Sequence, residues 1–351
     1  MNYLIRVLVL GLVIARIAPA NADDLSTRIV AAVPDGFSGQ IVVASPERRL
    51  YSGSFGLADR ETERPVVDST LFDIGSITKT FTATAILQLA GAGRLELDAT
   101  LDAYFAGLEP PKSGITIHQL LTHSSGLPEY SGEDEEQRTG ASFDAWLVDT
   151  PLDFPPGDHY AYSNPGYSAL ARIVEKVSGR GYEEYLQQMV LDPLGITAIG
   201  YVQLPRNLDQ AVGYFDGTSG GIPSSRSWLE DGPGWNLRGN GGLLASAESL
   251  MTFGQALARG DTLPPEQATA QLKEQISEGE EGQWYGYGIG ISERPYGRVI
   301  SHNGGNGAFF AMLAWYPGDG LLLAVTQNAF DENQLRALLP ALRAAVGIGE
   351  D

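Results

Sequence analysis

The stretch that decides the fold of this chain is FDIGSITKTFTATAILQLAG, residues 72–91. Apolar residues recur in it with a spacing of four, at Ile77, Phe81, Ala85 and Leu89. That spacing places side chains on one face of an α-helix. The pattern therefore predicts a largely apolar helix that has Ser76 in its first turn and ends at Gly91 or Gly93.

Strand patterns lie toward the two ends of the chain, at residues 39–44 and 49–56 and again at 285–290, 298–301, 308–316 and 321–327. Between them the pattern is mostly helical, most clearly at 117–122, 167–178 and 182–191. A last helix is expected over 332–346, with a kink or break at Pro340. These patterns predict a mixed α/β (α+β) fold: one antiparallel sheet built from both chain ends and flanked by helices, with a mostly helical insert at about residues 80–235.

The first 22 residues form a separate block. Arg6 supplies positive charge, residues 7–15 are apolar, and Ala20-Asn21-Ala22 has the small-x-small pattern of a cleavage site. A membrane anchor is the alternative, but Arg16 and Pro19 interrupt the run well short of the roughly 20 apolar residues that a span requires. We expect a cleavable signal peptide at 1–22, no membrane span after its removal, and a periplasmic or secreted domain at 23–351.

Composition limits the partners. The chain has 43 acidic and 23 basic residues, a formal net charge of −20, and no Cys. Nucleic acid is therefore disfavoured as a partner, and the core must be stable without disulfides. Acidic residues concentrate at 133–136 and 278–281, and such runs are usually solvated loops. The role of the acidic segment 129–143 stays open, and one hypothesis is that it covers a cleft.

The first candidate catalytic element is Ser76-Ile77-Thr78-Lys79. Residues i and i+3 share a helix face, so the Lys79 amine can reach the Ser76 hydroxyl. The amides at a helix N-terminus also favour a developing oxyanion. An N-cap Ser followed by a surface Lys is the alternative, but Lys79 starts a largely apolar helix. We interpret Ser76 as a nucleophile and expect Lys79 to take part in moving its proton.

The second element is Tyr162-Ser163-Asn164, which precedes a helix. A phenol with an ordinary pKa of about 10 is a poor base, but a neighbouring Lys ammonium lowers that pKa. We therefore expect Tyr162 to share a proton with Lys79 and to activate water, and Asn164 to hold Lys79 or a substrate carbonyl. An Asx turn beside a packed Tyr is the alternative.

The third element is His302-Asn303-Gly304-Gly305, expected as a Gly-rich loop after a short strand. Glycines let a substrate approach the backbone closely. His302 is expected to donate a hydrogen bond into the cleft, and the Gly305 amide to form an oxyanion hole with the Ser76 amide. A β-turn with an exposed His is the alternative.

Together, Ser-x-x-Lys, Tyr-x-Asn and His-x-Gly resemble, in order, the three motifs of class C β-lactamases and of related penicillin-binding D,D-peptidases and esterases. The resemblance extends over residues 39–329 and includes the segment LTHSSGLP at 121–128. It implies a β-lactamase/transpeptidase-like fold and a structural rather than catalytic role for His123.

One departure concerns the third motif. Lactamases that hydrolyse penicillins well usually have Lys-Thr-Gly where this chain has His302-Asn303-Gly304. An imidazole with an ordinary pKa of about 6.5 lacks the permanent charge of Lys. His at this position resembles the esterase and D-aminopeptidase branches of the family.

The expected function is therefore that of a serine hydrolase that forms an acyl-enzyme with ester, amide or D-amino-acid peptide bonds. The alternatives are a β-lactamase proper and a penicillin or peptidoglycan-fragment receptor that is acylated at Ser76 without turnover. A small-molecule or peptidoglycan-like acyl substrate is expected. We expect neither a metal nor another cofactor, because the sequence has no His-Glu-x-x-His pattern and no Cys cluster.

Overall fold

The structure is a computed structural model and describes residues 22–204 and 208–349. The predicted signal peptide lies outside these residues, apart from Ala22, where helix α1 begins. Within the described ranges, no helix is both long enough and apolar enough to cross a bilayer.

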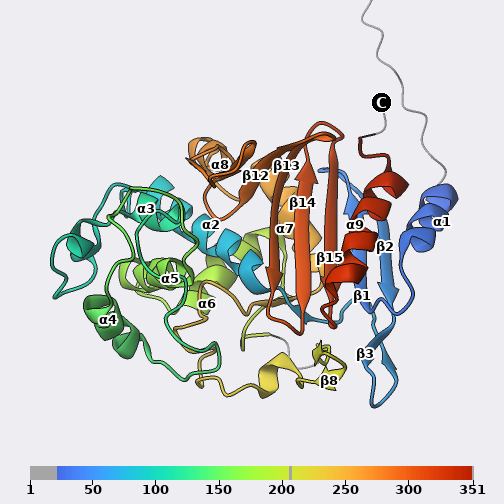
Figure 1. Cartoon of the computed structure of the whole chain (residues 1–351), viewed down its shortest axis with the longest axis horizontal. Helices are drawn as coiled ribbons and strands as arrows, with labels where there is room; N and C mark the ends of the chain where they lie inside the picture. The colour runs from blue at the N-terminus through green and yellow to red at the C-terminus, as the bar shows by residue number, and fades with distance from the viewer. Residues whose placement is uncertain (1–21, 205–207, 350–351) are drawn as a thin grey trace, which may run out of the picture.

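A large antiparallel sheet organises the described chain (Figure 1). Its strand order is β10-β11-β12-β13-β14-β15-β1-β2, so the N-terminal hairpin pairs with the C-terminal strands. The strands are β1 (Gly39–Ala44), β2 (Arg49–Phe55), β10 (Ile276–Ser277), β11 (Gln283–Tyr285), β12 (Gly290–Arg294), β13 (Gly297–Gly305), β14 (Phe310–Tyr316) and β15 (Leu321–Gln327). This arrangement confirms the predicted sheet built from both chain ends.

Within the described ranges, short strands form three smaller sheets beside the large one. They are β3 (Leu57–Asp59) with β4 (Arg64–Pro65), β5 (Phe72–Asp73) and β6 (Ile199–Gly200) on either side of β9 (Leu244–Ala245), and β7 (Tyr214–Phe215) with β8 (Thr218–Ser219). The β5–β9 pairing matters for the site, because β5 leads directly into the turn that carries Ser76.

Helices cover both faces of the large sheet. The helices are α1 (Ala22–Ala32), α2 (Thr78–Gly91), α3 (Ile117–Leu121), α4 (Gly140–Asp149), α5 (Asn164–Ser178), α6 (Tyr182–Tyr185), α7 (Ala247–Arg259), α8 (Pro265–Gln271) and α9 (Glu332–Val346). α1 and α9 pack on the face that is nearer in Figure 1, and α7 packs on the other. This arrangement confirms the predicted fold class. Helix α9 continues through Pro340, so the sequence-based expectation of a break at this residue is wrong.

The residues of the central strands explain this layering. In β1, Ile41 and Val43 belong to the core shared with α1 and α9, whereas Val42 and Ala44 belong to the core on the other face. Because side chains alternate along a strand, a strand that is apolar at every position must be covered on both sides.

Helix α2 joins the sheet to the helical region at the left of Figure 1. Its residues from Thr78 to Leu87 are all buried, and Phe81 stacks on Phe253 of α7 with ring centroids 4.0 Å apart. A helix that is buried all round lies inside a protein rather than on its surface. The N-terminal end of α2 therefore lies where sheet and helical region meet.

Two predictions about the C-terminal strands are wrong. Residues 285–290 do not form one strand, because β11 ends at Tyr285, the amide of Gly286 donates to the carbonyl of Ile289, and β12 begins at Gly290. Gly288 has a positive φ of 72°, which a turn accommodates and a strand does not. The third motif is not a loop, because β13 continues through it to Gly305.

Candidate active site

Ser76 lies in a single 3₁₀ turn, Gly75–Ile77, that runs directly into α2. Lys79 follows one turn later and its side chain is completely buried. The Lys79 Nζ atom lies 3.1 Å from Ser76 Oγ, 2.7 Å from Asn164 Oδ1 and 2.8 Å from the Asn240 carbonyl oxygen. The predicted Ser76–Lys79 pair is thus formed, and two further oxygens hold the amine.

These surroundings favour the neutral form of Lys79. Burial lowers the pKa of Lys79 well below its ordinary value, and the more distant Asp134 carboxylate only partly opposes this. None of its three hydrogen-bond partners is a carboxylate. A neutral amine has two N–H groups and one lone pair. It can donate to Asn164 and Asn240 and accept the proton of Ser76.

The second motif reaches the same point from α5. Ser163 is the N-cap of this helix: its Oγ accepts from the Gly166 amide at 3.2 Å and donates to the Pro128 carbonyl at 2.9 Å. Asn164, the first residue of α5, can therefore direct its side chain at Lys79. The Tyr162 ring centroid lies 4.7 Å from Lys79 Nζ.

The prediction that Lys79 lowers the pKa of Tyr162 is wrong. Burial raises the pKa of the Tyr162 phenol, and its hydrogen bond with Ser76 opposes this only in part. A neutral Lys79 amine does not supply the positive charge that would stabilise a phenolate. Tyr162 therefore stays protonated at neutral pH, in hydrogen-bonding contact with the Ser76 hydroxyl.

His302 lies in β13 with its side chain buried. Its Nδ1 donates to the Asn303 carbonyl at 2.7 Å, because a carbonyl only accepts. Its Nε2 then accepts from the Tyr285 hydroxyl at 3.0 Å. Both ring nitrogens have protein partners, so the imidazole does not make the donation into the cleft that the sequence suggested. Burial lowers its pKa to about 4, which leaves the ring uncharged at pH 7.

The third motif brings two backbone amides together. A Cβ atom on Gly304 would lie 2.6 Å from the Ser76 amide nitrogen and 2.0 Å from the Ile74 carbonyl oxygen. A Cβ on Gly75, whose φ is +49°, would lie 2.6 Å from the Gly305 amide nitrogen. Only glycine permits this approach of β13 to the Ser76 turn. The Ser76 and Gly305 amides are thereby neighbours, as an oxyanion hole requires.

β13 also presents an open edge at the site. β12 pairs with β13 only from Gly297 to Ser301, whereas β14 pairs with it as far as Gly305. On the β12 side, the described strands therefore leave residues 302–305 unpaired beside Ser76. An extended backbone could add to this edge as a further strand.

A cavity of about 880 Å³ opens on these groups, and Ser76, Tyr162, His302, Gly304 and Gly305 contribute to its lining. That volume suits a small-molecule or peptide substrate. A smaller adjoining cavity of about 240 Å³ is also lined by Ser76 and Tyr162, together with Tyr130 and Asp134. The acidic segment 129–143 thus borders the cleft.

The family resemblance implies a structural role for His123, and the contacts of this residue show what it supports. It is fully buried and has a φ of +56°. Its carbonyl accepts from the Ala161 amide at 2.8 Å and its Nδ1 from the Ser163 amide at 3.0 Å. Its ring lies 4.3 Å from that of Tyr162. His123 therefore holds the backbone on both sides of Tyr162.

Sequence reasoning missed the contacts by which Asp73, Asn240 and Tyr285 support the site. Asp73 accepts from the Gly75 amide at 2.8 Å and pairs with Arg226 at 2.6 Å, which fixes the turn before Ser76. Asn240 supplies a backbone carbonyl to Lys79, and Tyr285 orients His302. Only Asp73 could have been noticed in the sequence, because an acidic residue stands three positions before Ser76. The contribution of Asn240 is a backbone carbonyl, which any residue type can supply.

Known proteins share this arrangement of sequence and fold. Residues 27–348 match the family model described as "Beta-lactamase". The chain is 28% identical to "Penicillin-binding protein 4*" of Bacillus subtilis, over 87% of this chain and 71% of the relative. It is 31% identical to "Esterase EstB" of Burkholderia gladioli, over 71% of this chain and 73% of the relative.

Solved structures agree with the sequence matches. The crystal structure of a penicillin-binding protein from Bacillus halodurans superposes with a TM-score of 0.74 at 28% identity, covering 91% of this chain and 99% of that one. The match to the family model extends over more than nine tenths of the described residues. The chain therefore belongs to the β-lactamase family of serine hydrolases.

Proposed function

We propose that the chain hydrolyses ester, amide or D-amino-acid peptide bonds through an acyl-enzyme on Ser76. The observation that carries this proposal is the buried Lys79 amine, which lies 3.1 Å from the Ser76 hydroxyl and has only uncharged hydrogen-bond partners. A nucleophilic Ser needs a base within hydrogen-bond reach, and a neutral amine is such a base.

In acylation, Ser76 Oγ attacks the substrate carbonyl while its proton passes to Lys79 Nζ. The oxygen of the tetrahedral intermediate lies between the Ser76 and Gly305 amides, each worth about 3 kcal/mol in comparable sites. The Lys79 ammonium then returns the proton, through the Tyr162 hydroxyl, to the leaving group. This expels an alcohol or an amine and leaves the acyl group on Ser76.

In deacylation, water replaces the leaving group and the same proton path runs in reverse. The sequence favoured Tyr162 for activating this water. The raised pKa of Tyr162 makes its phenol a better proton relay than a base. We therefore assign proton abstraction to Lys79 and proton relay to Tyr162, with Asn164 holding the amine.

The third motif supports acyl donors other than β-lactams. The His302 imidazole has a pKa of about 4 and is uncharged at neutral pH. It therefore offers no permanent charge to the carboxylate of a penicillin, in contrast to a Lys at the same position. The open edge at 302–305 and the expected exported location favour a peptide or ester substrate, including peptidoglycan-like material outside the cytoplasm.

The test compares three acyl donors on the mature protein: a chromogenic short-chain ester, a cephalosporin and a D-alanyl peptide. We expect turnover of the ester or the peptide, a transient adduct on Ser76 by mass spectrometry, and loss of both in the Ser76→Ala variant. A persistent adduct without turnover would instead identify a receptor, and fastest turnover of the cephalosporin a β-lactamase. No adduct with any donor or with a fluorophosphonate would refute the proposal.

We further propose that residues 1–22 direct export and are removed. N-terminal sequencing of the protein recovered from the periplasm or the medium tests this, with Asp23 expected as the first residue. Recovery of the chain from the cytoplasm with Met1 intact would contradict it.

A further inference from the structure

A third cavity, distinct from the one lined by Tyr130 and Asp134, adjoins the active site on the β12 side and has a volume of about 240 Å³. It shares Tyr162, Ser301, His302 and Asn303 with the lining of the cavity that contains Ser76, so the two cavities lie side by side. We call it the Glu278 cavity, after the carboxylate that contributes to its wall. The mechanism proposed above makes no use of it.

The Glu278 carboxylate is placed to receive a charged partner. Glu278 is half-buried, and no hydrogen bond or ion pair joins its side chain to another residue of the described ranges. Arg294 and Glu280 act on it only at longer range, with opposite signs. The Arg294 guanidinium instead donates to Ser292 and Gln283. Leaving a half-buried carboxylate without a partner costs stability, which a bound cation would recover.

The aromatic walls of the cavity suit an ammonium group, and the Arg294 guanidinium, which donates to Ser292 and Gln283, also lines the cavity. Tyr160 and Tyr285 line it, with their ring centroids 5.9 Å apart. Burial raises the pKa of both phenols, so the rings stay neutral. Aromatic faces attract cations, and this attraction adds to that of a carboxylate. The net charge of −20 also favours the approach of cationic molecules.

The strand register sets the distance from this carboxylate to the reacting carbonyl. A Cβ on Gly290 would lie 3.9 Å from Glu278 Oε1, and Gly290 pairs with Ser301. Ser301 precedes the oxyanion donor Gly305 by four residues on β13. With a rise of about 3.3 Å per residue, the two points are roughly 13 Å apart. An extended peptide spans that distance with three to four residues.

We propose that the Glu278 cavity binds an ammonium group carried by a peptide-like acyl donor, three to four residues from the scissile carbonyl. The donor lies along the open edge of β13 at residues 302–305, with its carbonyl at Ser76 and its amine between Glu278 and the rings of Tyr160 and Tyr285. This inference rests on the proposed function, because it takes Ser76 as the reacting end. It differs from the specificity of a D-aminopeptidase, in which the amine is adjacent to the scissile carbonyl.

The experiment uses D-alanine p-nitroanilides extended at the N-terminus by zero to four glycines, each with a free or an acetylated amine. For the wild-type protein, the ratio of kcat/KM between the free and the acetylated form should peak at about tenfold or more with two or three glycines. The Glu278→Gln variant should bring the ratio to about one at every length. Glu281→Gln is the matched control, because it removes the same charge from the same acidic turn outside the cavity, and it should keep the peak.

Three results would overturn the inference: a ratio that peaks with no glycine, a peak that survives Glu278→Gln, or an equal loss in Glu281→Gln. Calorimetric binding of the same peptides to the Ser76→Ala protein makes the test independent of turnover. Fluorophosphonate labelling of Ser76 reports on the proposed function separately. Labelling without an amine preference refutes the cavity assignment alone. An amine preference in calorimetric binding, with neither labelling nor turnover of any donor, refutes the proposed function alone.

Discussion

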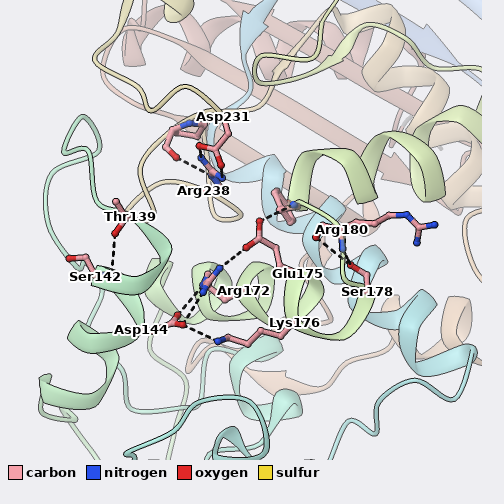
Figure 2. A network of polar contacts seen from close by, with 12 residues as sticks. Thr139, Ser142, Asp144, Arg172, Glu175, Lys176, Ser178, Arg180, Asp231 and Arg238 are labelled. Carbon is pink, nitrogen blue, oxygen red and sulfur yellow. Dashed lines mark hydrogen bonds and ion pairs between the residues drawn. The ribbon is translucent and has the colours of Figure 1, made fainter.

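Two lysines of this chain show how surroundings decide what an amine does. Lys176 belongs to a network of polar contacts between α4 and α5 (Figure 2). In this network the Asp144 carboxylate accepts hydrogen bonds from Lys176 Nζ and from the Nε and Nη2 atoms of Arg172, each at 2.9 Å. Burial disfavours the Asp144 carboxylate, but these cations outweigh it and lower its pKa. Lys79, by contrast, is completely buried among a hydroxyl and two amide oxygens.

The difference lies in the charge of the partners. Asp144 is a carboxylate that forms ion pairs with Lys176 and Arg172, so this network joins α4 to α5. Neutral oxygens orient the Lys79 amine without stabilising its positive charge, while burial penalises that charge. A buried amine with uncharged partners is therefore suited to proton transfer, whereas a paired one is suited to structure.

The most severe test of this comparison replaces each lysine by Met. Lys79→Met should lower kcat/KM by about 10³-fold or more, because the base is lost, while leaving the free energy of unfolding unchanged or higher. Lys176→Met should leave kcat/KM unchanged and cost about 0.2–1 kcal/mol of stability. Steady-state kinetics and urea unfolding measure both. A similar loss of kcat/KM in the two variants would contradict the assignment of Lys79 as the base and of Lys176 as a structural residue.

Tyr162→Phe removes only the hydroxyl that contacts Ser76. If this phenol relays protons, kcat should fall by about 10²-fold with little change in KM. Donors with a good leaving group, such as nitrophenyl esters, should suffer less than amides, because they need less proton transfer on departure. Equal losses for both donors would argue that Tyr162 only positions the substrate.

The two histidines His123 and His159 differ, like the two lysines, in burial and in the charge of their partners. His123 is fully buried and accepts from the Ser163 amide, whereas His159 is exposed and pairs with Asp158. His123→Ala should lower kcat about tenfold and cost about 1–3 kcal/mol, because the backbone beside Tyr162 loses its acceptor. His159→Ala should do neither. A His123→Ala enzyme with normal kcat but lower stability would limit His123 to a purely structural role.

Much of this arrangement could be predicted from the sequence, and the errors have physical causes. Strands such as β1 and β15 were placed correctly because their apolar runs are long and their turns explicit. Residues 285–290 were misassigned because alternation with glycine looks the same in a strand and in a turn. The pKa of Tyr162 was predicted in the wrong direction because the sequence pattern does not reveal how deeply the phenol is buried. Asn240 escaped notice because its contribution is a backbone carbonyl.

A further expected effect concerns pH. The pKa of His302 is about 4 in the folded protein and ordinarily about 6.5, so the unfolded chain binds the proton first as the pH falls. The stability that His302 contributes is complete above pH 6.5 and is lost toward pH 4, by about 1.4 kcal/mol per pH unit. Urea unfolding of the wild type and of His302→Gln isolates this contribution from carboxyl groups that titrate in the same range. Parallel stability curves for the two proteins would show that His302 is not buried in its neutral form.

The protonation state of Lys79 is the centre of the account, and NMR measures it directly. The chain has four lysines, so labelling their side chains with ¹³C and ¹⁵N gives few signals, and the Lys79→Met variant assigns one of them to Lys79. We predict that this signal titrates well below pH 10.5, as a neutral amine beside Ser76 requires. A Lys79 side chain that stays protonated up to pH 10.5 or above would contradict the account.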